Sequence, residues 1–176
     1  MTRTLRTMAV LAVVLAISVL NASAQTASIH ADLLKDWTAL KDTMMKIADA
    51  MPEAKFSFKA TPPERTYGEQ ILHVAQANVG LLGGLGGKAT APSVDMKATK
   101  KADVLKALSD SFDYGTALLK EQTDQTMMDA VMAPYLGSSS RTRVYSFLMG
   151  HAWDIYGQLA VYLRLNGKVP PASQRP

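Results

Sequence analysis

Four stretches of the chain carry apolar residues at helical spacing, and this repeat limits the fold more than any other feature. The stretches cover about residues 28–50, 66–82, 100–122 and 141–166, where apolar side chains recur every three or four residues. No stretch alternates with a period of two for long enough to predict a strand. The pattern therefore predicts an all-α fold, a four-helix bundle with one long central connection.

Residues that cap helices mark where two of these helices begin and end. Thr66 and Glu69 have the spacing of a capping box, in which each side chain bonds a free backbone N–H of the first turn. Ser139 or Ser140 suits the N-cap of the last helix. Gly167 suits its C-terminal end, because glycine adopts the left-handed conformation that closes many helices. These positions predict the helix boundaries.

The first 24 residues have the composition of a secretory signal peptide. Two arginines precede an uncharged apolar run at 8–20, and small residues follow at 22–24. The run is shorter than the ~20 residues that a membrane-spanning helix needs. We therefore expect cleavage before Gln25, a periplasmic or secreted location in a bacterium, and a single mature domain at 25–176.

Charge and composition argue against several classes of function. The chain has 19 basic and 15 acidic residues, and two of the basic residues lie in the signal segment. Because basic and acidic residues are nearly equal in number, we expect the protein not to bind nucleic acid and, after processing, not to bind a membrane. The chain has no cysteine, which excludes disulfides, thiolate nucleophiles and zinc–thiolate sites. The glycines at 83–87 lack the spacing of a phosphate-binding loop and predict a flexible connection.

The candidates for chemistry are the histidines, of which the chain has three. We assign no role to His30, which begins the first helix. His151 shares a helix face with apolar residues, so we expect it to point inward. A buried imidazole either bonds a polar neighbour or binds a metal, and the spacing leaves both readings open. His73 lies among small residues on the face opposite the apolar stripe of its helix, so spacing does not settle its burial.

Two stretches of the sequence resemble the signature stretches of the DinB-like family. They are RTYGEQILHVAQAN at 65–78 and HAWDIYGQLAVYLRLNGKVPP at 151–171. The resemblance implies a four-helix bundle that, in many members, holds a divalent metal on three histidines. One ligand comes from the second helix and two from an H-x-x-x-H pair on the fourth. Members with known activity include thiol-dependent transferases and metal-dependent hydrolases and isomerases, and dimers are common.

Carried over by position, this resemblance implies an incomplete metal site. His73 and His151 match two of the ligands, but Ile155 occupies the position of the third. Isoleucine offers no ligand atom. Asp154 is the remaining candidate, because side chains three residues apart on a helix can reach one ion.

Three hypotheses about function follow. The first is an exported, catalytically inactive bundle with a degraded metal site that binds a small molecule or a partner. This first hypothesis needs no metal. The second is a hydrolase or transferase that uses zinc, nickel, iron or manganese, bound by His73, His151 and Asp154. The third is a bundle whose main role is to form a homodimer.

Overall fold

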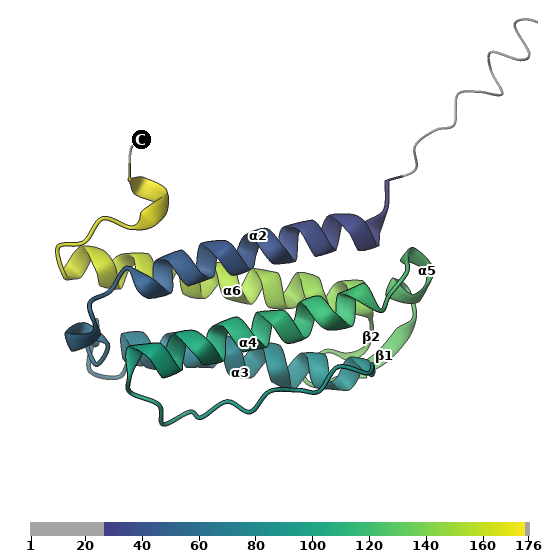
Figure 1. Ribbon diagram of the computed structural model, residues 1–176, viewed down its shortest axis with the longest axis horizontal. Helices are drawn as coiled ribbons and strands as arrows, with labels where there is room; N and C mark the ends of the chain where they lie inside the picture. The colour runs from purple at the N-terminus through teal and green to yellow at the C-terminus, as the bar shows by residue number, and fades with distance from the viewer. Residues whose placement is uncertain (1–26, 175–176) are drawn as a thin grey trace, which may run out of the picture.

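The computed structural model describes residues 27–174, so the predicted signal peptide at 1–24 lies outside the described residues. The predicted bundle is confirmed, because four long helices run side by side along the long axis of the molecule (Figure 1). They are α2 (Ile29–Asp49), α3 (Tyr67–Leu82), α4 (Lys101–Lys120) and α6 (Arg141–Leu165). Within the described range, no helix is both long and apolar enough to cross a membrane.

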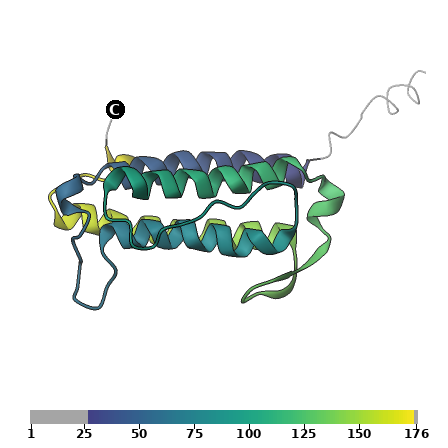
Figure 2. The same cartoon turned by 60° about the horizontal axis from the view of Figure 1, so that its bottom comes forward.

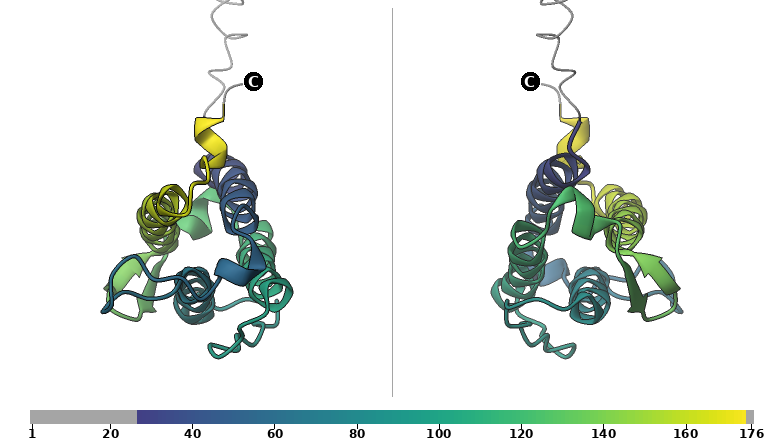
Figure 3. Two further views of the ribbon diagram at one scale, coloured as in Figure 1. Left: turned by 90° about the vertical axis from the view of Figure 1, so that its left-hand side faces the viewer. Right: turned by 90° about the vertical axis from the view of Figure 1, so that its right-hand side faces the viewer.

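The four helices occupy the corners of a square in the order α2, α4, α3 and α6 (Figure 3). Consecutive helices α2 and α3 therefore lie on a diagonal, and α3 packs against α4 on one side and α6 on the other. Because α3 and α4 run in the same direction, the connection between them returns along the whole bundle (Figures 1 and 2). This connection is the long one that the sequence predicts.

The predicted helix ends are confirmed by the hydrogen bonds at each of them. Thr66 Oγ1 accepts from the Glu69 N–H at 3.1 Å, and the Glu69 carboxylate accepts from the Thr66 N–H at 2.7 Å. Ser140, rather than its neighbour, is the N-cap of α6, because its hydroxyl accepts from the Arg143 N–H at 3.2 Å. Gly167 follows α6 with a φ of 68°, the left-handed conformation that glycine adopts without strain.

A small β-hairpin shows that the expectation of no strand is wrong for residues 130–140. Strands β1 (Ala130–Ala133) and β2 (Gly137–Ser140) pair antiparallel, with Ala130 opposite Ser140. Each strand has four residues, with only Ala, Val and Met in β1 and only Gly and Ser in β2, so neither carries an alternation of apolar and polar residues that a sequence could reveal. The shorter helical elements are η1 (Glu53–Lys55), η2 (Gly83–Leu85), α5 (Asp124–Met127) and η3 (Pro171–Ser173).

The core is organised around Trp37, which is completely buried between α2, α4 and α6. Its ring lies 4.8 Å from that of Phe112 and 5.3 Å from that of Tyr145, and its Nε1 donates to the Phe112 carbonyl at 2.9 Å. Gly115 makes room for this ring, because a Cβ at that position would lie 2.5 Å from it. The Tyr145 hydroxyl then donates to the Gly115 carbonyl at 2.8 Å. Packing of this kind replaces disulfides as the source of stability.

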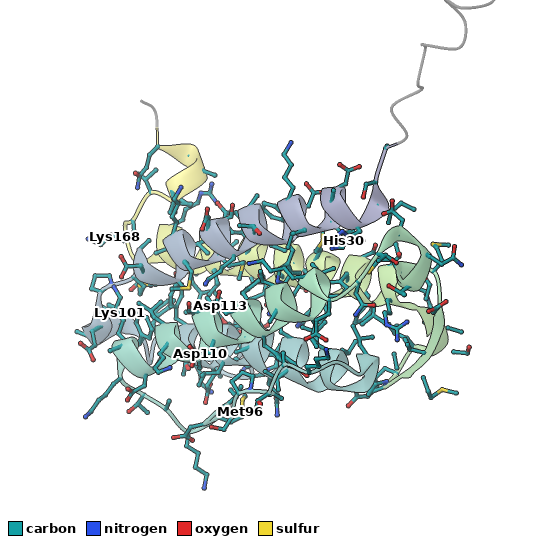
Figure 4. All side chains as sticks on the ribbon, turned by 45° about the vertical axis from the view of Figure 1, so that its right-hand side comes forward. His30, Met96, Lys101, Asp110, Asp113 and Lys168 are labelled. Atoms are coloured by element: carbon teal, nitrogen blue, oxygen red, sulfur yellow. The ribbon has the colours of Figure 1, made fainter. Side chains whose placement is uncertain are left out.

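Polar contacts between α2 and α4 lie on the outside of the bundle. Lys101, labelled in Figure 4, pairs with Asp49 at 2.9 Å, where α4 begins beside the end of α2. Exposed ion pairs of this kind contribute only about 0–1 kcal/mol each. At the opposite end, His30 Nε2 lies 2.8 Å from the Leu119 carbonyl (Figure 4). His30, to which the sequence assigns no role, thus links the start of α2 to the end of α4 through a hydrogen bond.

Candidate functional site

His73 on α3 and His151 on α6 meet where these two helices pack. Their ring centroids are 4.8 Å apart and the ring planes are perpendicular, so one imidazole presents its edge to the face of the other. Both side chains are partly buried. The structure therefore brings together two of the three residues that the sequence nominates as ligands.

The surroundings of the pair favour neutral imidazoles. Burial lowers the pKa of His73, and the positive charge of Arg65 lowers it further. Burial also lowers the pKa of His151, with Arg65 acting in the same direction and the carboxylate of Asp154 opposing it. The Nε2 atom of His151 is shielded from solvent and has no hydrogen-bond partner among the described residues. A neutral ring with such an unpaired nitrogen can bind a metal or a polar ligand.

Asp154 belongs to a different set of contacts from the histidines. Its exposed carboxylate accepts a hydrogen bond from Gln158 Nε2 at 3.1 Å. The Oε1 atom of Gln158 in turn accepts from Gln70 Nε2 at 2.7 Å, which links α6 to α3. Gln70 is only 1% exposed, and its own Oε1 lacks a partner in the described part of the chain. Asp154, the third proposed ligand, is thus hydrogen-bonded to a pair of glutamines that joins α6 to α3.

In the part of the chain that the structure describes, the side chains are not arranged as a complete three-ligand metal site. Ile155 is 2% exposed and belongs to the core, at the position where the family resemblance places a histidine. Within residues 27–174, no three His, Cys, Asp or Glu side chains are placed to share an ion. Protein sites for catalytic zinc generally use three such ligands. The two imidazoles alone supply two donors, and the role of Asp154 as the third stays a prediction.

A cavity of about 560 Å³ lies beside the histidine pair. It is bordered by α3, α6 and the tip of the hairpin, which lies outside the bundle next to these helices (Figure 3). The lining residues are His73, Gln76, Ala77, Gly80, Leu81, Pro134, Tyr135, Phe147 and His151. Its volume is in the range of small-molecule sites, about 300–1,000 Å³. The small residues on the His73 face of α3 therefore make room for a cavity.

Two aromatic residues at this cavity were not identified from the sequence. Phe147 precedes His151 by one helical turn, so helical spacing could have identified it as a neighbour. Tyr135 lies at the tip of the hairpin, between β1 and β2. No sequence pattern could have placed it here, because the hairpin itself was not predicted.

Comparison with known proteins identifies the family of the chain. The sequence profile of the DinB superfamily matches residues 36–159, which include α3 and most of α6 with both histidines. The chain belongs to the DinB superfamily. No curated protein matches its sequence significantly.

Solved structures of other DinB-like proteins have the same fold. A DinB-like protein from Bacillus cereus ATCC 10987 is 20% identical, with a TM-score of 0.68 over 79% of this chain and 93% of its own. The DinB-like protein YjoA of Bacillus subtilis is 14% identical, with a TM-score of 0.62 over 82% and 99%. At such identities the likeness shows a common fold and carries no function with it.

YfiT from Bacillus subtilis is a further structure with this fold. It is 14% identical, with a TM-score of 0.56 over 79% of this chain and 88% of its own. It is described as a probable metal-dependent hydrolase with an unusual four-helix bundle topology. The diagonal placement of α2 and α3 is a feature of this DinB-superfamily bundle that departs from simple up-and-down connectivity.

Proposed function

We propose that this DinB-superfamily protein is exported, loses residues 1–24, and binds a small, mainly apolar molecule in the cavity between α3 and α6. The observation that carries the proposal is the position of the histidine pair. His73 and His151 lie in the wall of a cavity of about 560 Å³, while Ile155 fills the core where a third metal ligand would be expected. The arrangement suits a binding site better than a complete metal centre.

The lining of the cavity supports this proposal. Most of it is apolar or small, and polar groups are few. Sites for small molecules commonly combine apolar walls with a few polar groups that fix the orientation of the ligand. A neutral imidazole offers one donor and one acceptor. The pair therefore favours a ligand with a hydroxyl, carbonyl or amine group on an apolar body.

Filling the cavity tests this proposal. Gly80 lies in the cavity wall and has no atom within 4 Å of the point where a Cβ would be, so the Cβ of Gly80→Phe meets no neighbour and the variant adds a ring at the cavity. Gly157 on α6 has equally open surroundings and does not line the cavity, so Gly157→Phe is the matched control. Titration with the fluorescent probe 8-anilinonaphthalene-1-sulfonate should show binding to the wild type and the control, and at least tenfold weaker binding to Gly80→Phe. Equal binding by all three proteins would refute the cavity as the site.

A second candidate function is that of a divalent-metal-dependent hydrolase or transferase. The unpaired, buried Nε2 of His151 beside His73 favours it, as does the fold likeness to YfiT. The site would use Asp154 as the third ligand, and its exposed carboxylate would have to leave Gln158. The metal would be zinc, nickel, iron or manganese, since imidazole and carboxylate ligands suit all four.

Calorimetric titration with each metal distinguishes this candidate from the first. Binding that is lost in both His151→Ala and Asp154→Ala supports a site with all three residues. Binding that survives in Asp154→Ala and is lost in His151→Ala excludes Asp154 as a ligand. Gln158→Ala is the informative third variant, because it frees the Asp154 carboxylate and should tighten binding if that carboxylate is a ligand.

A further inference from the structure

The backbone of Tyr135 adopts a conformation that is unfavourable for its residue type. Its φ is 63°, and it is the sole residue other than glycine with a positive φ in the described range. Glycine and asparagine are usual in this region, and a bulky side chain there is an outlier. The Tyr135 side chain is 96% exposed, so no packing offsets the strain. Strained residues of this kind are concentrated at functional sites.

Contacts with neighbouring elements fix the position of the hairpin that carries Tyr135. Arg143, in the first turn of α6, donates to the carbonyl of Leu136 at 3.1 Å and to the hydroxyl of Ser139. Strand β1 packs against η2, where the Met132 carbonyl lies 3.2 Å from the position of a Cβ on Gly84. The residue directly after Tyr135 is therefore held by α6. Tyr135 itself borders the cavity, and its side chain is not packed against the rest of the protein.

Phe147 supplies a second exposed ring in the wall of the same cavity. It is 46% exposed and lies on α6, one turn before His151. Large aromatic side chains contribute strongly to binding when they become buried, and they prefer stacked or edge-to-face contacts with other rings. Two such residues left open to solvent, at a mainly apolar cavity with two imidazoles in its wall, favour a flat ligand.

We propose that Tyr135 and Phe147 form an aromatic clamp, and that the ligand is a planar aromatic molecule with one hydrogen-bonding group directed toward His73 and His151. This inference rests on the proposed function of the cavity and names the class of its ligand. The hairpin tip supplies one ring and α6 the other, while the imidazoles supply the polar contact.

Two alcohols of similar ring size test the clamp. The aromatic probe is 2-naphthol, and its saturated counterpart is decahydro-2-naphthol, which keeps the hydroxyl and loses the flat rings. Titration calorimetry on the mature protein should show 2-naphthol binding about tenfold tighter, which is the upper range of the effect of one aromatic pair. Tyr135→Leu and Phe147→Leu should each weaken 2-naphthol binding about three- to tenfold and leave the saturated alcohol unchanged.

Trp153→Leu is the matched control, because Trp153 is a 49% exposed aromatic residue of α6 that does not line the cavity. It should change neither affinity. Equal affinities for the two alcohols, or a 2-naphthol affinity that is unchanged in Tyr135→Leu and Phe147→Leu, would refute the clamp and leave the cavity as a site. Binding of neither alcohol would refute the proposed function, and the clamp with it.

A stability measurement tests the strain on its own. Tyr135→Gly removes both the ring and the strained backbone, so its melting temperature should equal or exceed that of the wild type while 2-naphthol binding weakens. A clear fall in melting temperature would show that Tyr135 supports the fold, and would overturn the argument that its conformation serves binding.

Discussion

The carboxylate of Asp154 accepts a hydrogen bond from Gln158, one turn later on α6, at 3.1 Å. The residue that follows Asp154, Ile155, is buried in the core and offers no ligand atom. A third ligand beside His73 and His151 would therefore require the Asp154 carboxylate to leave Gln158.

Ile155→His should restore a third imidazole to the site. Zinc or nickel should bind more tightly than to the wild type, by more than the ~10-fold that the outer hydrogen-bond partners of metal ligands contribute. Added metal should raise the melting temperature, because an ion that binds only the folded state stabilises it. Without metal, the variant should lose about 1–3 kcal/mol of stability, since a polar ring replaces buried apolar surface. Titration calorimetry and thermal melts measure both effects.

Ile155→Gln is the control for this substitution, because glutamine is polar and a poor ligand for these metals. It should lose stability in the same way and gain no metal affinity. If Ile155→His gains none either, the positions of His73 and His151 do not match the metal geometry of other superfamily members. Nanomolar zinc binding by the wild type would show instead that Asp154, or a further residue, completes the site.

Acid should destabilise the protein through its histidine pair. The folded state holds the pKa of both His73 and His151 below the usual value near 6.5. Below about pH 6.5 these two side chains therefore bind more protons in the unfolded chain than in the folded protein, so their contribution to the free energy of unfolding falls as the pH drops and is constant above. Urea unfolding at pH 7.5, 6.5 and 5.5 should show this loss.

Replacing both histidines isolates their contribution to the pH dependence. In the double variant His73→Gln and His151→Gln, the stability loss between pH 6.5 and pH 5.5 should become smaller, because neither side chain titrates. An unchanged loss would mean that other groups cause the acid sensitivity and that the pair is not held neutral by the fold.

Gly115→Ala should destabilise the bundle by about 1–3 kcal/mol, the usual cost of forcing a methyl group into a packed core. The added Cβ would lie 2.5 Å from the ring of Trp37, which is buried and cannot move aside. Gly157→Ala on α6 is the control, because its Cβ meets nothing within 4 Å. That change should stabilise by up to about 1 kcal/mol through helix propensity. Chemical denaturation of both variants measures the contrast, and similar effects would show that Gly115 is not required for the packing of Trp37.

Export should remove the first 24 residues of the chain. Mass spectrometry of protein from the periplasm or medium of a secretion-competent bacterium should show Gln25 as the first residue. The apolar run at 8–20 with small residues after it is the basis of this expectation. Folded protein from the same fractions that still carries Met1 would contradict it.

The sequence by itself determined the long helices and several of their ends. The Thr66–Glu69 box and the Ser140 cap act within one turn, so local residue order is sufficient to predict them. Helical periodicity likewise placed Ile155 on the buried face of α6, because burial follows the apolar stripe. Both features depend on neighbours that are close in the sequence.

Only the tertiary structure decided how the site is built. Periodicity shows which face of a helix is apolar, but it does not show which helix packs against it, so the meeting of His73 with His151 could not be derived from spacing. The two strands on either side of Tyr135 are too short to leave a pattern. Gln158, the partner of Asp154 on α6, is held in turn by Gln70 from α3, a residue 88 positions away in the sequence. Contacts between distant segments select these arrangements, and local sequence does not encode them.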